Sequence, residues 1–327
     1  MNIFEDKLIN NIYEQIKDKN YTVVIPDGED PRVINAITYL KDIKIVLLGD
    51  SEKINNLLKE KEGQINIDVE VITPSVREDL LEILLEKTKN SKKPLTKEEA
   101  MERMVYPPYY ACLLLEKGEV DACVGGSIYP SSDILRPTLQ IIKGEKPNKL
   151  ISTYMVLQKP TETLVFSDCA LNLCPDATQL VDITYDTIQS AKRIGIDPKV
   201  AMLCYSTKGS GKGEVVEKMQ QAYANFINEY SEYENSVIGE IQFDAAYSAE
   251  VGKIKIKDSD LPGKINTFIF PDLNSGNIGY KIAQYLGNFE ALGPLLQGVR
   301  KPVNDLSRGV KDVEIAKIIY LTLANLI

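Results

Sequence analysis

Short apolar runs rich in β-branched residues alternate along this chain with stretches of helical periodicity. The runs predict strands, which cover 21–25, 44–48, 69–71, 120–125, 164–166, 200–205 and 267–270. Helical patterns follow many of them, at 32–40, 77–89, 178–194, 213–230 and 279–286. Strands that alternate with helices in this way predict an α/β fold with mostly parallel sheets and helices on both faces of each sheet.

The length of 327 residues favours two domains over one. The segment 144–149 marks the expected border between them. The last helical pattern, 312–327, is too apolar to stand alone, so we expect it to return to the first domain. The predicted domains are therefore 1–147 plus 300–327, and 148–299. This arrangement places the residues just before 312 in the cleft between the domains, a common location for ligand sites.

Composition argues against several classes of protein. The net charge of −9 disfavours a nucleic-acid binder, which normally carries a basic surface, and no apolar run approaches the ~20 residues of a membrane span. The five cysteines form no Cys-x-x-Cys pair and stand in apolar contexts, so we expect reduced core thiols and no zinc site. Their odd number, and acidic residues where a signal peptide would be basic, indicate a cytoplasmic protein.

Histidine is absent from the chain. Its absence removes the usual general base near neutral pH and the commonest metal ligand. Catalysis by Ser-His-Asp or Cys-His groups is therefore excluded. Any acid–base step must use Asp, Glu, Lys, Tyr or Cys.

The segment 301–309, Lys-Pro-Val-Asn-Asp-Leu-Ser-Arg-Gly, carries the strongest chemical signal. After a predicted turn at 302–305, it places the Ser307 hydroxyl, the Arg308 guanidinium and Gly309 side by side. A hydroxyl can donate to a developing oxyanion, an arginine fork can hold a phosphate in two places, and glycine permits a tight turn. A loop that only caps the next helix is the alternative.

Two acids follow in the first turn of the last predicted helix, Asp312 and Glu314. The helix macrodipole alone favours acids at this position, so a structural role competes with a catalytic one.

Two further loops are candidate ligand contacts. The loop at 205–213 follows a strand and opens a helix, where backbone N–H groups can cradle an anion. It departs from the P-loop pattern because Lys212 is followed by glycine, so a nucleoside triphosphatase is rejected. A plain surface turn remains open. The candidate residues of this loop are Ser206, Thr207, Gly209 and Ser210.

The segment 270–277 ends a strand and leads through small polar residues into a helix, where ligands gather in α/β proteins. Asn274 and Gly276 are its candidates, and a helix cap by Asn277 explains part of the same pattern. Arg136 is expected at the start of a helix with hydroxyl and acidic caps.

A set of segments occurs in the order found in phosphate acetyltransferases. They lie at 25–30, 47–49, 135–140, 168–170, 200–207, 242–246, 268–274 and 293–298, and they lead into the motif at 301–309. The chain resembles this family over nearly its whole length. The related phosphate butyryltransferases share the scaffold.

The resemblance implies the two-domain α/β fold of isocitrate and isopropylmalate dehydrogenases, with the active site in the interdomain cleft. It implies reversible acetyl transfer between acetyl phosphate and coenzyme A, with no bound cofactor and no metal. Coenzyme A, acetyl phosphate and phosphate are then the partners, and a homodimer is the family expectation. In this chemistry a carboxylate takes the thiol proton and the thiolate attacks directly in a ternary complex. Ser307 would steady the oxyanion, while Arg308 and Arg136 would hold the phosphoryl group.

Three departures from the family pattern bear on the site. The family base is an aspartate seven residues after the serine, where this chain has Glu314, so Asp312 is a rival base. The family's Ser-Gly-Ala is Gly125-Gly126-Ser127 here, and Tyr129 stands where a nearby histidine is usual. The additional substrate-binding arginine of the family has Arg103 as its nearest candidate.

The departures leave two alternatives open. One is a propionyl- or butyryltransferase on the same scaffold, with Gly126 and Ser127 facing the acyl or phosphoryl group. The other is a non-catalytic, CoA-binding regulatory module.

Overall fold

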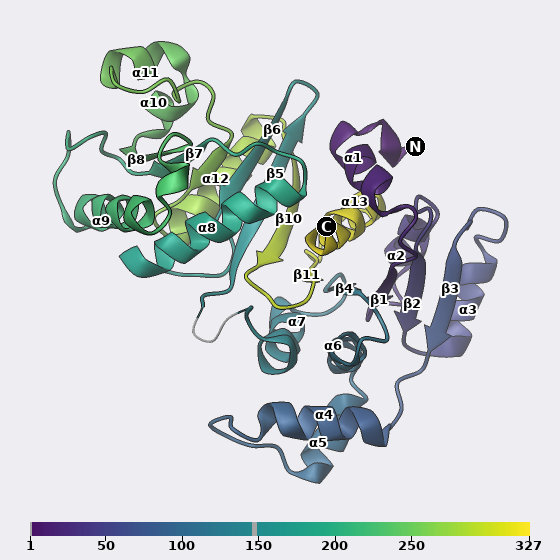
Figure 1. Cartoon of the computed structure of the whole chain (residues 1–327). Helices are drawn as coiled ribbons and strands as arrows, with labels where there is room; N and C mark the ends of the chain where they lie inside the picture. The colour runs from purple at the N-terminus through teal and green to yellow at the C-terminus, as the bar shows by residue number, and fades with distance from the viewer. Residues whose placement is uncertain (1, 146–148) are drawn as a thin grey trace. The chain divides into compact units, whose positions relative to one another are not determined.

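The computed structural model describes residues 2–145 and 149–327. Its chain divides into two compact units (Figure 1), Met1–Pro147 with Val299–Ile327, and Asn148–Gly298. The second unit is a single continuous stretch, whereas the first is built from both ends of the chain.

The first unit contains a five-stranded parallel sheet in the order β11-β4-β1-β2-β3. Its strands are β1 (Thr22–Ile25), β2 (Lys44–Leu48), β3 (Asp68–Ile72), β4 (Ala122–Gly125) and β11 (Val303–Asp305). The consecutive residues Val23, Val24 and Ile25 of the central strand are all fully buried, so both faces of the sheet are covered. The order reverses beside β1, because β2 and β3 lie on one side of it and β4 on the other. In an open α/β sheet, ligands bind beyond the carboxyl ends of the strands at such a point.

Two groups of helices cover this sheet. The first comprises α1 (Lys7–Ile16), α2 (Pro31–Ile37) and α13 (Asp312–Leu323), with α13 in contact with α1, α2 and β4. The second surrounds α6 (Pro107–Lys117), which contacts β1 and β4, and comprises α4 (Glu78–Thr88), α5 (Lys97–Met104) and α7 (Ser131–Pro137). The remaining elements are α3 (Ser51–Lys59) and short helical turns at Ile3–Glu5, Thr138–Ile142 and Ala324–Leu326.

The second unit contains a six-stranded mixed sheet in the order β10-β5-β6-β9-β7-β8. Strands β6, β9, β7 and β8 run parallel, whereas β5 pairs antiparallel with both β6 and β10. The bounds are β5 (Ser152–Lys159), β6 (Glu162–Ser167), β7 (Val200–Leu203), β8 (Val237–Ile241), β9 (Thr267–Ile269) and β10 (Glu290–Gln297).

Two hydrophobic clusters flank this second sheet. One packs α8 (Ala177–Arg193) and α9 (Glu214–Glu229) against β7 through residues such as Met202, Met219 and Phe226. The other gathers Phe166 and Phe268 with residues of α10 (Phe243–Tyr247), α11 (Ala249–Lys255) and α12 (Leu273–Leu286). A short helical turn at Ser231–Tyr233 completes the unit.

The predicted α/β architecture with mostly parallel sheets is confirmed, and each predicted strand is present within three residues of its expected bounds. The prediction of a turn at 302–305 is wrong. These residues enter strand β11, and Asn304 and Asp305 are buried despite their polarity.

Several local predictions also need correction. Helix α12 begins at Leu273, so the segment expected to be a loop at 274–277 is helical, and its N-cap is Asp272. Helix α7 has Pro130 as its N-cap, with no side-chain cap, and Arg136 lies in its last turn. Cys174 is exposed, whereas the other four cysteines are buried as expected. Within residues 2–145 and 149–327, no helix combines the length and apolarity needed to cross a membrane.

Candidate functional site

The loop 306–311 joins β11 to α13 at the carboxyl end of the first sheet, beside the point where the strand order reverses. The Leu306 N–H donates to the Gly125 carbonyl at 2.6 Å, and the Val310 N–H donates to the Ser307 carbonyl at 3.0 Å. These bonds continue the β11–β4 pairing and then turn the chain. Ser307 and Arg308 are exposed on the outside of this turn.

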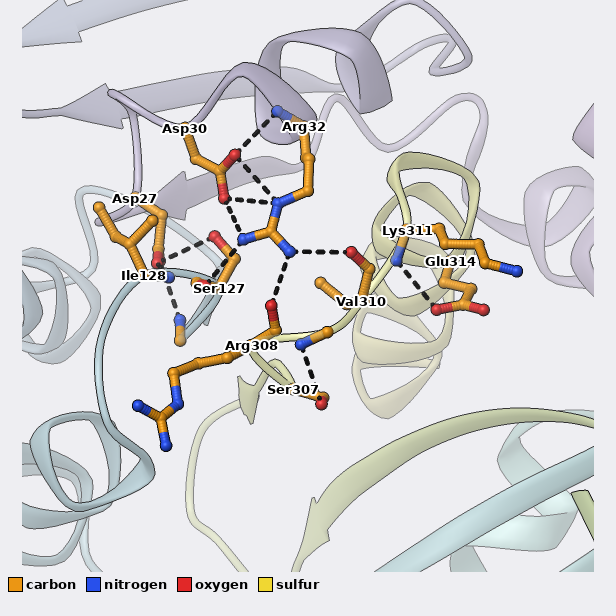
Figure 2. A network of polar contacts seen from close by, with 12 residues as sticks. Asp27, Asp30, Arg32, Ser127, Ile128, Ser307, Arg308, Val310, Lys311 and Glu314 are labelled. Carbon is orange, nitrogen blue, oxygen red and sulfur yellow. Dashed lines mark hydrogen bonds and ion pairs between the residues drawn. The ribbon is translucent and has the colours of Figure 1, made fainter. Parts of the chain in front are cut away.

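Arg32 clamps the loop from the first turn of α2 (Figure 2). Its Nη1 donates to the Arg308 carbonyl at 2.8 Å and to the Val310 carbonyl at 3.0 Å. Its Nη2 donates to the Ser127 carbonyl at 2.9 Å, which ties the loop to the segment after β4. The backbone carrying Ser307 and Arg308 is therefore held by a fork-shaped cation with a fixed geometry.

Asp30 holds that guanidinium in place. It is 4 % exposed, forms an ion pair with Arg32 Nη2 at 2.8 Å, and also accepts from Arg32 Nε at 3.1 Å. Burial alone would raise the pKa of Asp30, but the bonds from Arg32 and Ser127 lower it below the ordinary value. The sequence analysis missed both residues. The available signal was their place directly after β1, at the edge where parallel strands present ligand sites.

Asp27 occupies the donors of the segment after β4. Its carboxylate accepts from the Gly126 N–H at 2.9 Å, the Ser127 hydroxyl at 3.1 Å and the Ile128 N–H at 2.8 Å. Gly126 and Ser127, both predicted substrate contacts, therefore face an internal carboxylate through these groups. Gly126 has φ +113°, and a Cβ there would clash with Asp305 Oδ1, so only glycine fits.

The side chains of the motif point away from this network. The Arg308 guanidinium extends from the loop in Figure 2, and among the described residues it has no ion-pair partner. The Ser307 Oγ accepts from the Gly309 N–H at 3.3 Å and leaves its own proton available. Gly309 has no positive φ, and a Cβ there would meet only the Ser307 Oγ, at 4.0 Å. The tight turn that we expected to require glycine at this position is therefore absent.

The two candidate bases occupy the first turn of α13. A Glu314 carboxylate oxygen accepts from the Lys311 N–H at 3.0 Å, and Asp312 accepts from the Val313 N–H at 2.8 Å. Glu314 thus serves the helix start with one oxygen (Figure 2), which leaves the other for chemistry. Both side chains are partly exposed.

The two candidate arginines lie on α5 and α7 of the first unit, helices that both contact α6. Arg136 is exposed at the end of α7, a helix that contacts β11. Arg103 lies in the last turn of α5, where its Nη1 makes a long contact of 3.5 Å to the Tyr109 hydroxyl.

The second unit's candidate loop already encloses a carboxylate. Glu240 is 3 % exposed and accepts from the Ser206 hydroxyl at 2.8 Å and the Gly209 N–H at 2.7 Å. Burial alone would raise the pKa of Glu240, but these two donors lower it. The Thr207 N–H donates to the Ser210 hydroxyl at 3.0 Å. Two donors of this loop are therefore occupied by an internal carboxylate, Glu240, which the sequence analysis missed, and a ligand anion at this loop stays a prediction.

Asn274 and Gly276 lie in the first turns of α12. Asn274 is exposed, whereas Gly276 lies so close to the Asp168 carbonyl that a Cβ would clash. Asn277 donates to the Cys169 carbonyl at 3.0 Å and does not cap the helix. In the part of the chain that the structure describes, no three His, Cys, Asp or Glu side chains are grouped as for a metal ion.

The fold and this loop together define an α/β protein that presents a hydroxyl and a guanidinium at a topological switch point. The sequence profile of the family described as "Phosphate acetyl/butaryl transferase" matches residues 7–323. The chain belongs to this family, as its sequence motifs predicted.

Relatives in sequence and in structure carry names of the same family. The chain is 37 % identical over 325 residues to a "Phosphate acetyltransferase" of Bacillus subtilis (strain 168), with 97 % of this chain and 98 % of the relative covered. A crystal structure of a phosphotransacetylase from Streptococcus pyogenes is 38 % identical, covers 98 % of each chain and gives a TM-score of 0.89. A 4-hydroxythreonine-4-phosphate dehydrogenase structure from Salmonella typhimurium, 12 % identical over 94 % of this chain and 99 % of that chain, shares the fold with a TM-score of 0.54. The predicted dehydrogenase-like fold is confirmed.

Proposed function

We propose that this protein is a phosphate acetyltransferase, an acyltransferase that interconverts acetyl phosphate plus coenzyme A with acetyl-CoA plus phosphate. The observation that carries the proposal is the exposed Ser307–Arg308 pair on a clamped loop, in a chain matched by its family over residues 7–323. Coenzyme A acts as a substrate, and the proposed chemistry uses neither a cofactor nor a metal.

In the proposed reaction the thiol proton of coenzyme A passes to Glu314 or Asp312, and the thiolate attacks the acetyl carbonyl in a ternary complex. The Ser307 hydroxyl donates to the oxyanion, and the Arg308 and Arg136 guanidinia hold the phosphoryl group. The C–O bond then breaks, and the departing phosphate takes up one proton, so that the proton lost by the thiol is balanced. Positioning and charge stabilisation supply most of the acceleration, because phosphate leaves readily.

The remaining predicted contacts are assigned to substrate binding. Gly126 and Ser127 support the phosphoryl side of the site through the Asp27 network. The loop with Ser206, Thr207, Gly209 and Ser210 is proposed for coenzyme A. Further candidate contacts are Asn274, Gly276 and Arg103, and the location in a cleft between the domains stays a prediction.

The test is thioester formation from acetyl phosphate and coenzyme A, followed by absorbance without added metal. Loss of one oxyanion donor costs about 10²–10³ in kcat, so Ser307→Ala should fall in that range. Arg308→Ala should abolish most turnover, and Arg308→Lys should recover little because a point charge cannot bind phosphate in two places. Wild-type protein with no turnover on any acyl phosphate would contradict the proposal.

The base is assigned by comparing Glu314→Gln with Asp312→Asn in the same assay. We expect the glutamine variant to lose turnover and the asparagine variant to keep it. The reverse result would make Asp312 the base. If both variants kept full turnover, neither residue would be the base.

A longer acyl substrate is the second candidate function. Tyr129 meets Tyr106 edge to face, with ring centroids 5.4 Å apart, next to the segment proposed to face the phosphoryl group. A pair of rings restricts space, so this contact favours acetyl. Turnover on acetyl, propionyl and butyryl phosphates compares the two, and wild-type preference for butyryl phosphate would replace acetyl. Tight binding of coenzyme A with no transfer of any acyl group would indicate the regulatory module.

We also propose a homodimer in the cytoplasm. Helix α12 presents exposed apolar side chains at helical spacing, Ile278, Ile282, Tyr285 and Leu286, the last two 77 % and 80 % exposed. A second copy of this chain covers them in the proposal. Ile282→Asp should convert a dimer to a monomer in light scattering, while Lys281→Asp, at an exposed neighbouring position, should not. All five cysteines are unpaired, as expected for a reducing compartment, and cell fractionation tests the location.

A further inference from the structure

Asp305 is the last residue of β11 and lies two positions before Ser307. It pairs with Gly125 in the β4 register, and the next N–H, that of Leu306, donates to the Gly125 carbonyl at 2.6 Å. Any movement of Asp305 is therefore transmitted directly to the loop that carries Ser307 and Arg308.

The Asp305 carboxyl is buried without the donors that a carboxylate needs. The residue is 6 % exposed, and its Oδ1 has no hydrogen-bond partner. The Gly126 backbone lies against that oxygen, because a Cβ on Gly126 would clash with it. The N–H of Gly126 cannot help, since it donates to Asp27. A charged carboxylate at this place would be desolvated, and its Oδ1 would have no donor.

Asp27 shows the contrast on the same piece of backbone. It lies against Gly125, where a Cβ would come within 2.9 Å of Asp27 Oδ2. It accepts from three groups of the 126–128 segment, which oppose the rise that burial causes in the pKa of Asp27. The donors of residues 126–128 thus go to Asp27, and none of these three reaches Asp305.

Charges nearby favour the neutral form of Asp305. The pKa of Asp305 is raised to about 7, mainly by burial and further by the charge of Asp27, against a smaller lowering by the Ser131 hydroxyl. The elements in contact with β11 carry other charged groups, Asp133 and Arg136 on α7 and Asp312, Glu314 and Lys317 on α13, and none of these is a cause of the shift. Asp27 is the charge that Asp305 responds to.

We propose that Asp305 works as a neutral carboxylic acid that positions the Ser307–Arg308 loop, and that its ionisation loosens this loop. An ionised Asp305 must leave its place against Gly126 to reach water, and β11 ends at this residue, so the displacement falls on Leu306 and Ser307. Asp305 is a positioning residue, because its buried oxygen does not reach a substrate. The inference rests on the proposed function only for its effect on turnover.

The first test follows the proton without using turnover. Infrared difference spectra of the full-length protein between pH 6 and pH 8.5 should show the loss of one buried carboxylic acid. The band should be absent in Asp305→Asn and present in Asp121→Asn. Asp121 is a suitable control because it lies at the opposite end of β4, where it accepts from the Thr22 N–H at 2.8 Å. If the wild-type protein shows no such carboxylic acid, the proposal is overturned even if no variant folds.

The second test is the pH dependence of kcat/KM between pH 6 and 9. We expect Asp305→Asn to keep at least half of the wild-type kcat/KM at pH 6. Above pH 7 the wild-type value should fall by at most about tenfold per pH unit, and the value of the variant should fall less steeply. In Asp27→Asn, which keeps Asp305, the fall of kcat/KM should begin at a lower pH, because the substitution removes a charge that raises the Asp305 pKa. An Asp305→Asn profile identical to wild type overturns the positioning role. A protein with the infrared signal but no turnover would instead count against the proposed function.

Discussion

Arg32 uses its whole guanidinium to hold backbone, not substrate. Its bonds reach Asp30, Ser127 and the loop carbonyls of Arg308 and Val310. A lysine keeps the charge but cannot reach these acceptors together. We expect Arg32→Lys to lower kcat about 10²-fold, since a misplacement of about 1 Å can cost that much.

The matched control for this prediction is Arg77→Lys. Arg77 also makes a forked ion pair in the first unit, with Asp79 and Glu119, but away from the loop. Steady-state kinetics should show normal kcat for Arg77→Lys. Equal kcat values for the two lysine variants would contradict the clamp.

Gly126 provides a second prediction at the residue scale. Alanine there meets two penalties, a backbone at φ +113° and a clash with Asp305 Oδ1. Alanine at Gly118, with φ +85° and no atom within 4 Å, meets the first penalty alone. Unfavourable backbone costs about 1–3 kcal/mol, so Gly118→Ala should lower the melting temperature moderately and Gly126→Ala considerably more. Similar melting temperatures would show that the carboxyl of Asp305 yields easily.

At the scale of elements, sequence patterns predicted the parallel strands because their residues are buried on both faces, as in Val23–Ile25. Strand β11 was not predicted, because Asn304 and Asp305 are typical turn residues. Asn304 is buried because it donates to the Thr322 hydroxyl on α13 at 2.7 Å, a partner 18 positions away. The motif itself could be read from the sequence, and so could the position of the loop after β7, whose binding of a ligand anion stays a prediction. The position of Asp30 and Arg32 after β1 marked them only as residues near a possible site. Their clamp, and the role of Glu240, depend on contacts between distant segments that the sequence does not show.

The loop after β7 depends on Glu240, at the end of β8. Glu240→Gln keeps the shape but removes a charge that accepts from Ser206 and Gly209. We expect this substitution to lower the free energy of unfolding by about 1–3 kcal/mol. It should also raise the KM for coenzyme A more than the KM for acetyl phosphate. The lowered pKa of Glu240 means that this stabilisation is present above its unfolded value of 4.5 and is lost as pH falls below it.

Thermal melting at pH 7 and pH 4 measures that pH effect. The difference between wild type and Glu240→Gln should be clear at pH 7 and smaller at pH 4, because the stabilisation begins to be lost below pH 4.5. Glu232→Gln, at an exposed position in the preceding turn, should match wild type at both. A difference that persists at low pH would mean that the shape of the side chain, not its charge, holds the loop.

At the scale of the whole molecule, the candidate residues are divided between the two units. Ser307, Arg308 and their clamp belong to the first, whereas Ser206 and Gly209 belong to the second. The second unit is one continuous stretch with its own two-sided core around Met202 and Phe268. The first unit closes without it, since Gly144 and Val299 form a β-bridge where the chain leaves and returns.

This arrangement predicts that residues 148–298 fold on their own. A domain with its own core, entered and left at neighbouring points of the chain, does not need the rest of the protein to bury its apolar surface. Calorimetry of this segment should give one cooperative transition of about 100 kcal/mol, from about 0.7 kcal/mol per residue over roughly 150 residues. Glu240→Gln should lower its melting temperature as it does in the full chain, because Ser206 and Gly209 are retained. A segment that melts without cooperativity would show that the second unit needs the first, and the predicted domain border would then be wrong as a folding boundary.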